Sequence, residues 1–314
     1  MVSFQDIQKA AERLNGVVHR TPVLRSEQLN TWVDAEVFFK CENFQKIGAF
    51  KYRGASNAIA LLDDQALKRG VCTHSSGNHA QALALAARKR GIPAYIVMPT
   101  SAPTVKRNAV LGYGATVIDC APTLDAREST AAEVVAKHGA TFIHPYDHPH
   151  IIAGQGTAAL ELLEDHPDLD AIIAPIGGGG LMSGTAIAAK GIKETIRVFG
   201  AEPEGADDAY RSFRTGEFQP QTGPDTICDG LLTSLGQLTW PIIKHELEDV
   251  LLVNDTETLQ ALKMIWTRAK IIVEPSCATP LAAIYRHRDQ LKLRGTKIGV
   301  ILSGGNVDLD ALPW

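Results

Sequence analysis

Cysteine is scarce in this sequence, and its spacing excludes two common kinds of scaffold. The 314 residues contain five cysteines, an odd number, and no two of them form a CxxC pair. Scattered cysteines are typical of reduced thiols, whereas disulfide frameworks and zinc sites need paired or regularly spaced ones. We therefore predict a cytoplasmic protein.

Long apolar runs and an excess of positive charge are also missing. No segment approaches the roughly 18 to 20 unbroken apolar residues of a membrane span, and the first residues lack the basic start and apolar centre of a signal peptide. The net charge of −4 offers no basic face for nucleic acid. With 45% hydrophobic and 21% charged residues, the composition is that of a globular protein without membrane or nucleic-acid partners.

Short apolar strands alternate with helical segments along most of the chain. A first helix is expected over residues 3–14, with Ser3 as its N-cap and Asp6 at the third helical position. Strands are expected at residues 36–40, 71–73, 94–98, 116–118, 141–143, 171–175, 197–201, 250–253 and 298–302. Further helices are expected at residues 79–90, 104–111, 125–138, 151–164, 181–190 and 255–269. Strands that lack a polar face and alternate with helices indicate parallel sheets covered on both sides.

Two polar stretches interrupt this alternation. The first, residues 144–150, is rich in proline and histidine and is expected to cross between two domains. The second, residues 202–224, is expected to be mainly loop.

Lys51 is the strongest candidate for a catalytic group. Small or apolar residues, from Ile47 to Phe50, precede it, although most lysines lie on solvated surfaces. A desolvated lysine has a lowered pKa, and its neutral amine can attack a carbonyl to form a Schiff base. Pyridoxal phosphate needs such a lysine, an anion cradle and a partner for its ring nitrogen.

Residues Gly177–Gly180 supply a candidate anion cradle. They follow a predicted strand and open a predicted helix, so their backbone N–H groups can converge on an anion at a helix N-terminus. The alternative is a flexible turn. The dinucleotide fingerprint G-x-G-x-x-G is not complete here, and no lysine follows as in a P-loop. A cradle for a single phosphate fits better.

Two further turns carry polar groups at the ends of strands. The turn Ser75–His79 can hold a carboxylate by the same physics, or it can simply be a well-capped helix start. Ser303 ends the last strand. Its hydroxyl can face a pyridine nitrogen as a neutral partner, which suits elimination or racemisation better than transamination. A polar turn is the plain alternative for Ser303.

Metal ligands are conceivable at two places. Glu202, Asp207 and Asp208 form an acidic loop whose oxygens suit Mg²⁺ or Ca²⁺, although most acidic loops are only solvated. The three histidines of the 144–150 stretch could bind a transition metal, but they are more simply explained as loop residues. Those three are His144, His148 and His150.

Together these motifs resemble the β-family of pyridoxal-phosphate enzymes, in its serine racemase and serine/threonine dehydratase branch. The resemblance runs from Thr21 to Asp308. It implies an α/β fold like that of the tryptophan synthase β subunit, with two open, twisted, parallel-type sheets covered by helices. It also implies a large domain, residues 1–62 and 148–314, and a small domain, residues 63–147, that carries the substrate-carboxylate loop. Relatives are dimers, so we expect a homodimer.

The resemblance also implies roles for individual residues. Lys51 would bind the cofactor covalently and move the α-proton of the substrate, and Asn78 would bind the cofactor's phenolic oxygen. The remaining cofactor contacts would come from Phe50, Gly177, Gly178, Gly179, Gly180 and Ser303. The substrate would be bound by Ser75, Ser76, Gly77, Asn78, His79, Arg127 and Ser234.

Two features favour a racemase within this branch. Ser76 stands where threonine dehydratases commonly have alanine, and a hydroxyl there supplies the second acid/base face that racemisation needs. Glu202, Asp208 and the carbonyl of Ala206 resemble the divalent site of racemases, which implies Mg²⁺, or Ca²⁺ or Mn²⁺. We therefore predict a lyase and isomerase that dehydrates L-serine and L-threonine to a 2-oxo acid and ammonia and racemises serine.

Other functions remain open at this point. An L-threo-3-hydroxyaspartate dehydratase belongs to the same branch, and Arg127 could meet the second carboxylate of that substrate. A nucleotide-dependent oxidoreductase would need the missing glycine fingerprint. A non-catalytic amino-acid binder would have no need of Lys51.

Overall fold

Two helix-covered sheets make up the computed structural model, which describes residues 2–314. The larger sheet has the strand order β1-β2-β10-β7-β8-β9. All of its pairs are parallel except β1 with β2. Its strands are β1 (Val23–Leu24), β2 (Glu36–Cys41), β7 (Ala171–Pro175), β8 (Arg197–Pro203), β9 (Asp249–Val253) and β10 (Lys297–Leu302).

The smaller sheet is entirely parallel and has the order β5-β4-β3-β6. Its strands are β3 (Val71–His74), β4 (Ala94–Pro99), β5 (Thr116–Cys120) and β6 (Thr141–Phe142). These lie in one continuous stretch of the chain, whereas the larger sheet takes strands from both sides of that stretch. The predicted α/β class with parallel-type sheets is therefore confirmed, while the exact domain boundaries stay a prediction.

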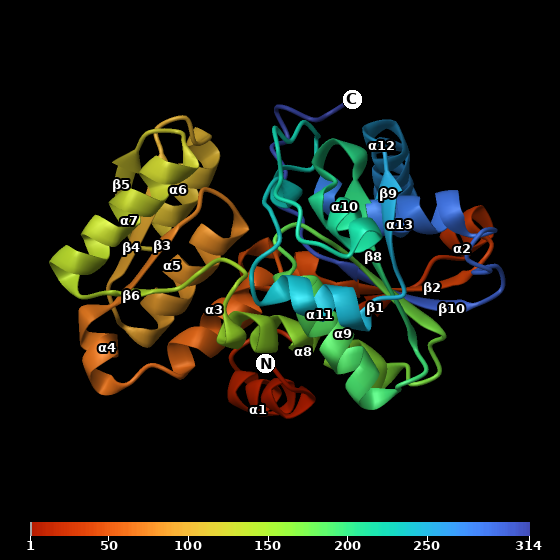
Figure 1. The fold of residues 1–314 in the computed structure, drawn as a ribbon, viewed down its shortest axis with the longest axis horizontal. Helices are drawn as coiled ribbons and strands as arrows, with labels where there is room; N and C mark the ends of the chain where they lie inside the picture. Colours follow the sequence, from red (N-terminus) through yellow and green to blue (C-terminus); the bar gives the residue numbers. More distant parts are fainter. Residues whose placement is uncertain (1) are drawn as a thin grey trace.

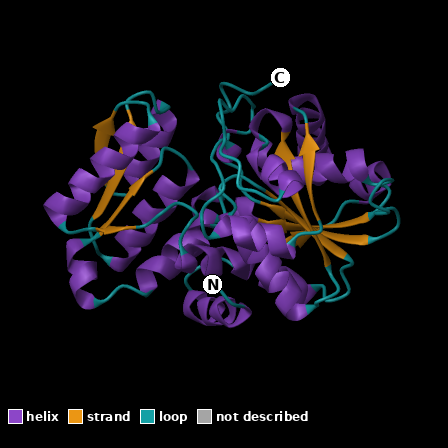
Figure 2. Ribbon diagram, viewed as in Figure 1, coloured by secondary structure: helices purple, strands orange, loops and turns teal. Residues whose placement is uncertain are grey.

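Helices cover both faces of both sheets (Figures 1 and 2). The helices are α1 (Phe4–Leu14), α2 (Glu27–Val33), α3 (Lys51–Ala60), α4 (Asp64–Arg69), α5 (Asn78–Arg90), α6 (Thr104–Gly112), α7 (Leu124–His138), α8 (Pro149–Asp165), α9 (Gly180–Ile192), α10 (Asp208–Thr215), α11 (Thr239–Glu246), α12 (Asp255–Met264) and α13 (Pro275–His287). Short 3₁₀ turns lie at Glu42–Phe44, Lys46–Gly48, Glu204–Ala206 and Asp229–Leu231, and a π turn at Ile265–Ala269.

Alternating side chains along the strands separate the core into layers, because successive residues of a strand point to opposite faces. In β2, Phe39 packs with α13 on one face of the larger sheet, and Phe38 packs with α8 and α9 on the other. The smaller sheet repeats this arrangement: Ile96 faces the α5 side and Val97 the α7 side. Both faces of each sheet are therefore buried.

The strands and helices predicted from the sequence are present in the structure, but helices α2, α4, α11 and α13 were not predicted, and two predictions need correction. The first helix has the predicted cap, since Ser3 and Asp6 form a capping box. The predicted loop 202–224 is partly wrong, because it contains helix α10 and a 3₁₀ turn. The predicted helix 255–269 is α-helical only to Met264 and ends in the π turn.

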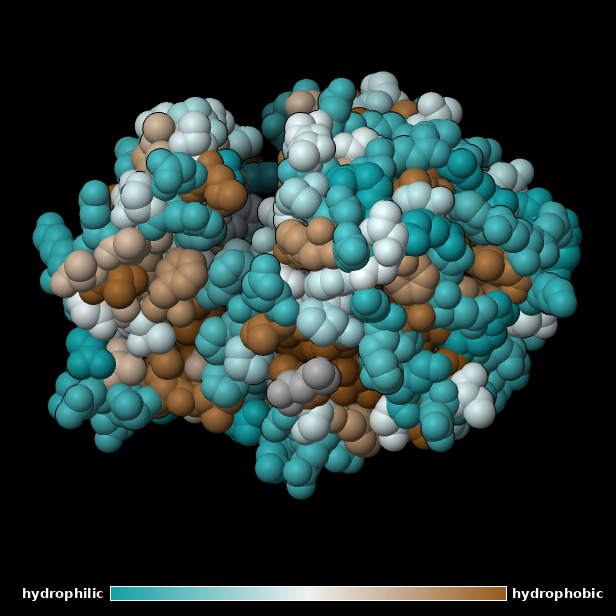
Figure 3. Space-filling model, viewed as in Figure 1, coloured by the Kyte–Doolittle hydropathy of each residue, from teal (hydrophilic) through white to brown (hydrophobic). Residues whose placement is uncertain are grey.

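The two sheets lie side by side, and helix α3 and the linker 143–149 pass between them (Figure 1). In the space-filling view, a hollow separates the two parts along one edge (Figure 3). An ion pair between Lys106 of α6 and Asp229 joins them. In residues 2–314, no helix is long and apolar enough to cross a membrane.

Candidate active site

Lys51 and Ser303 are far apart in sequence but lie together in the structure. Ser303 directly follows β10, and its carbonyl oxygen accepts a hydrogen bond of 2.9 Å from the backbone N–H of Phe50. Ala49 forms an isolated antiparallel bridge with Gly304. Lys51 then begins helix α3. The end of the central strand β10 therefore positions the predicted lysine beside the predicted partner of the ring nitrogen.

The Lys51 amine is enclosed, and no carboxylate is hydrogen-bonded to it. Its Nζ donates a hydrogen bond of 2.8 Å to the carbonyl oxygen of Pro145 and lies 5.2 Å from the centre of the Phe50 ring. Burial lowers the pKa of Lys51 from 10.5 to about 8, against the opposing charge of Glu274. More of this amine is neutral near physiological pH than at an exposed lysine, as attack on a carbonyl requires.

The four glycines form a buried turn between β7 and α9. Gly179 is the N-cap residue of α9, has φ = +85°, and provides no side-chain cap to the helix. A Cβ atom at Gly178 would lie 2.3 Å from the ring of Tyr146. The backbone N–H groups that open α9 therefore have no capping side chain, and the turn tolerates no larger residue. This arrangement fits the phosphate of pyridoxal phosphate.

A second uncapped helix start lies across the hollow, at the end of β3. Helix α5 begins at Asn78, and its N-cap residue Gly77 has no side chain to offer. Ser75 Oγ accepts a hydrogen bond of 3.4 Å from Gly77 N–H, and Ser76 is partly buried in the same turn. The geometry fits a small carboxylate held by backbone N–H groups.

The ring of His79 is turned away from this anion site. Its Nε2 lies 3.3 Å from the carbonyl oxygen of Ile143, and the side chain is 2% exposed. Burial and the nearby charge of Lys51 lower the pKa of His79 well below 6.5, so the ring is neutral. Of the predicted substrate contacts, His79 can therefore contribute through its backbone N–H.

Sequence reasoning assigned no role to Glu274 or Asn306, which hold Asn78. Both carboxylate oxygens of Glu274 accept hydrogen bonds from Asn78 Nδ2, at 3.0 and 3.2 Å. Asn306 Nδ2 donates to Asn78 Oδ1 at 2.8 Å. Burial, with the charge of Asp229, raises the pKa of Glu274 to about 7. The only sequence signals were positional: Glu274 precedes a proline that opens a helix, and Asn306 follows two glycines after a strand.

Tyr146 is another residue that the sequence did not reveal. Its ring covers the glycine turn and meets the ring of His144 edge to face, with centroids 4.6 Å apart. His144 Nδ1 accepts the backbone N–H of Asp147 at 2.9 Å. In residues 2–314, no group of three or more His, Cys, Asp or Glu side chains could hold a metal ion. Of the three histidines, His144 lies in the linker, His148 is the N-cap residue of α8 and His150 lies in its first turn, and they do not form a metal site.

The two predicted metal carboxylates are buried and receive hydrogen bonds only from neutral groups. Glu202 accepts from the backbone N–H groups of Ala209 and Tyr210, at 3.1 and 2.8 Å. Asp208 accepts from Leu235 N–H at 2.9 Å and from Gln221 Nε2 at 3.2 Å.

The electrostatics of this pair call for a cation. Burial and the charge of Asp208 raise the pKa of Glu202 well above 4.5, and burial raises the pKa of Asp208 to about 6. Asp207, by contrast, pairs with Arg211 at 2.8 Å. Two adjacent buried carboxylates with open lone pairs fit Mg²⁺ or Ca²⁺, completed by a carbonyl such as that of Ala206 and by water.

Arg127 lies on α7, which packs on the smaller sheet, and Ser234 lies in the loop before α11, which packs on α9 beside the larger sheet. Arg127, on α7, has a buried Nε without a hydrogen-bond partner among the described residues. Ser234 Oγ accepts a hydrogen bond of 2.9 Å from Gln221 N–H, and Gln221 in turn bonds Asp208. The structure gives neither residue a hydrogen bond to another predicted substrate contact.

Comparisons with known proteins agree with this geometry. The family described as pyridoxal-phosphate dependent enzyme matches residues 14–304. The chain is 52% identical to a serine racemase of Dictyostelium discoideum over 313 residues, 99% of this chain and 97% of that one. A crystal structure of serine racemase from that organism superposes with a TM-score of 0.94 and covers 98% of this chain and 99% of its own.

Two other relatives have different stated activities. A beta-hydroxyaspartate dehydratase of Paracoccus denitrificans is 48% identical over 312 residues, 99% of this chain and 98% of the relative. The crystal structure of a threonine deaminase from T.th. is 40% identical, has a TM-score of 0.92, and covers 98% of this chain and 99% of that one.

Proposed function

The chain belongs to the family of pyridoxal-phosphate-dependent enzymes, and we propose that it racemises serine and dehydrates L-serine and L-threonine. The observation that carries this proposal is the enclosed Lys51 amine, with its lowered pKa, beside Ser303. The 52% identity to a serine racemase over nearly the whole chain supports the same activity.

The cofactor would be held at three points. Lys51 would bind it covalently, the N–H groups of Gly177–Gly180 would hold its phosphate, and the Ser303 hydroxyl would face its ring nitrogen. When bound, pyridoxal phosphate stabilises the negative charge that develops at the substrate α-carbon as the proton leaves. A neutral serine leaves the ring nitrogen largely unprotonated, which favours racemisation and elimination over transamination.

The protein's own groups then handle the substrate. The start of α5 binds the substrate carboxylate, which orients the α-carbon between Lys51 and Ser76. Lys51 takes the α-proton on one face. Ser76 donates a proton on the other face, and this inverts the centre, because a single base returns the proton to the side that it left. Alternatively, the β-hydroxyl leaves with a proton as water, and hydrolysis of the resulting 2-aminoacrylate gives the 2-oxo acid and ammonia.

Further parts of the proposal concern the metal, the assembly and the location. Glu202, Asp208 and the Ala206 carbonyl bind Mg²⁺ or a similar divalent cation, supported by the raised pKa values of the two carboxylates. We propose residues 63–147 as the small domain, and a cytoplasmic homodimer. All five cysteines are buried and unbonded to each other, as a reducing compartment allows.

The test is a chiral product analysis. Purified protein with pyridoxal phosphate and Mg²⁺ is given L-serine, and pyruvate and D-serine are measured in the same sample. We expect both products. Absence of both, with the cofactor bound, would contradict the proposal.

A second candidate activity is the dehydration of L-threo-3-hydroxyaspartate to oxaloacetate and ammonia. The specific observation that favours it is Arg127, whose buried Nε has no partner among the described residues and suits a second carboxylate. The 48% identity to a beta-hydroxyaspartate dehydratase supports it as well. The kcat/KM values for the two substrates decide between them, and Arg127→Met should lower only the value for hydroxyaspartate.

A further inference from the structure

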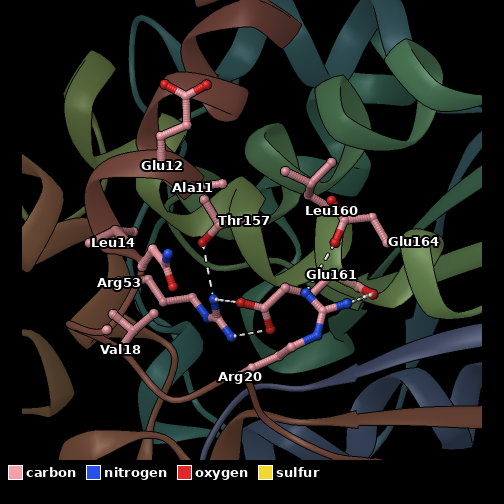
Figure 4. A pocket seen from close by; sticks show the side chains of 12 residues that line it. Ala11, Glu12, Leu14, Val18, Arg20, Arg53, Thr157, Leu160, Glu161 and Glu164 are labelled. Atoms are coloured by element: carbon pink, nitrogen blue, oxygen red, sulfur yellow. Dashed lines mark hydrogen bonds and ion pairs between the residues drawn. The ribbon is translucent and has the colours of Figure 1, made fainter.

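Two basic residues in the first turn of α3 are directed to different surroundings. Lys51 reaches the carbonyl of Pro145 in the candidate active site. Arg53, two residues later, reaches Glu42 at the end of β2 and Thr157 and Glu161 on α8. Figure 4 shows Arg53 between Thr157 and Glu161 at the bottom of a pocket.

The Arg53 guanidinium is paired with two carboxylates at once. Nε and one terminal nitrogen donate to the two oxygens of Glu42, at 2.7 and 2.9 Å. The two terminal nitrogens donate to the two oxygens of Glu161, at 2.6 and 2.8 Å. Lys40 also pairs with Glu161 at 2.7 Å, which balances two positive with two negative charges. We call Lys40, Glu42, Arg53 and Glu161 the Arg53 network.

This network fixes a helix start that has no local cap. The residue before α3, Phe50, has helical backbone angles and makes no side-chain capping bond. On the active-site side, the turn is attached to the protein through Phe50 N–H and the Ser303 carbonyl. On the opposite side it is attached through Arg53, whose bidentate bonds restrict orientation as well as distance. The placement of Lys51 depends on both attachments.

We propose that Arg53 is a positioning residue, which holds the Lys51 amine in the geometry that cofactor attachment and proton transfer require. The inference rests on the proposed role of Lys51. Arg53 acts through the backbone of α3, and none of its bonds reaches a residue of the candidate active site. A displacement of about 1 Å at a reacting group can lower a rate by about 100-fold, so the loss of this support should be visible in kcat.

The pocket in Figure 4 offers a way to replace the guanidinium chemically. It has a volume of about 270 Å³, reaches down to Arg53, and has Arg20 and Glu164 among its other lining residues. Arg53 itself has no exposed surface. Shortening Arg53 to alanine would extend the pocket to the two carboxylates, so that free guanidinium ions can enter and pair with them.

The experiment compares Arg53→Ala with Arg20→Ala. Arg20 lines the same pocket but is half-exposed, and it pairs with Glu164 and Asp165. Its one contact with the Arg53 network is a long hydrogen bond of 3.5 Å to the backbone carbonyl of Glu161, so its variant should retain wild-type kcat. We expect Arg53→Ala to lower kcat about 100-fold, with a smaller change in KM, and to shift the pH midpoint of cofactor attachment. Guanidinium chloride at low concentration should restore part of kcat in this variant alone, whereas equal sodium chloride should not.

Two further variants separate positioning from stability. Removing Arg53 leaves the buried Glu42 carboxylate without a cationic partner, which destabilises the fold. The double variant Arg53→Ala, Glu42→Gln has no unpaired charge at residue 42. It should be well folded but should still have a low kcat. Leu29→Ala, in the core away from the site, serves as a control that lowers the melting temperature without affecting kcat below it.

The outcomes distinguish this inference from the proposed function. If folded Arg53 variants keep wild-type kcat and pH midpoint, or if guanidinium restores nothing, Arg53 is not a positioning residue. If wild-type protein shows neither cofactor absorbance nor turnover, the proposed function itself fails.

Discussion

Two groups of buried charges in this protein differ in one respect: whether each charge has a partner. In the Arg53 network, two cations and two carboxylates lie within hydrogen-bonding distance of one another. Outside this network, Lys51 at the candidate active site is bonded to a carbonyl, and the buried Glu202 and Asp208 at the candidate metal site are bonded to neutral donors. Only in the first group does each charge have a directly bonded partner of opposite charge.

The pKa values follow this difference. Charge pairing holds the pKa of Glu161 below its usual value, despite burial. Without a cation, burial raises the pKa of Asp208 to about 6, and burial lowers the pKa of Lys51 to about 8. An ionisable group whose burial is not compensated is costly for stability. Such groups are therefore candidates for sites that bind a cofactor, a substrate or a metal.

The largest effect is expected when the uncompensated lysine is removed. Lys51→Ala should abolish turnover and the visible absorbance of the attached cofactor, because no other described residue offers an amine at this place. Absorption spectra and a turnover assay test this, with the exposed Lys244→Ala as a control. Variant protein whose cofactor can still be fixed to the chain by borohydride would contradict the assignment.

A divalent cation should compensate the acidic pair. The pKa of Asp208 rises from 3.8 to about 6 on folding. The protonated group therefore makes its full contribution to the free energy of unfolding below pH 3.8, and this contribution is lost as the pH increases to about 6. Mg²⁺ should therefore raise the free energy of unfolding above that pH, by about 2.7 kcal/mol at 100 times its Kd. The increase should shrink in acid, because protons compete for the carboxylates.

Thermal melts with and without Mg²⁺ provide the measurement. Glu202→Gln should lose the Mg²⁺ effect. Glu204→Gln should keep it, because Glu204 is exposed and already pairs with Arg286. An equal Mg²⁺ effect in both variants would rule out this site.

Removal of the Ser76 hydroxyl, on the face of the substrate opposite Lys51, should affect racemisation more than dehydration. Ser76→Ala should lower racemisation about 100-fold, the usual contribution of one general acid or base, while dehydration continues at a rate close to the wild-type rate. Simultaneous measurement of D-serine and pyruvate gives the ratio. Ser75→Ala, in the same turn, should reduce both products together. Equal losses of both products in Ser76→Ala would argue against two-base chemistry.

Much of the fold could be predicted because its signals are local. Apolar strands, the Ser3 cap and the glycine turn each depend on residues close together in sequence, and the structure contains each of them. Helix α10 was missed because its sequence is mostly polar, and its single face of buried residues follows an acidic loop.

The environment of the site was less predictable, because its contacts join distant segments. Sequence reasoning found Lys51 through its apolar neighbours, but the carbonyl that it bonds belongs to Pro145 on the linker. The bond from Asn78 to Glu274 depends on how the two sheets are placed, and the bonds from Arg53 to Glu161 depend on how helix α8 packs against α3. Only the folded chain shows which charges are paired and which are left without a partner.

The most direct test of this account is the titration of Lys51 in the cofactor-free protein. Competitive labelling of lysines over a range of pH, read out by mass spectrometry, gives the pKa of each amine. The account predicts a pKa of about 8 for Lys51. Glu274→Gln should lower that pKa slightly further, because it removes the charge that favours the protonated amine. A Lys51 that titrates near the ordinary 10.5 would contradict the claim that its charge is buried without a directly bonded carboxylate.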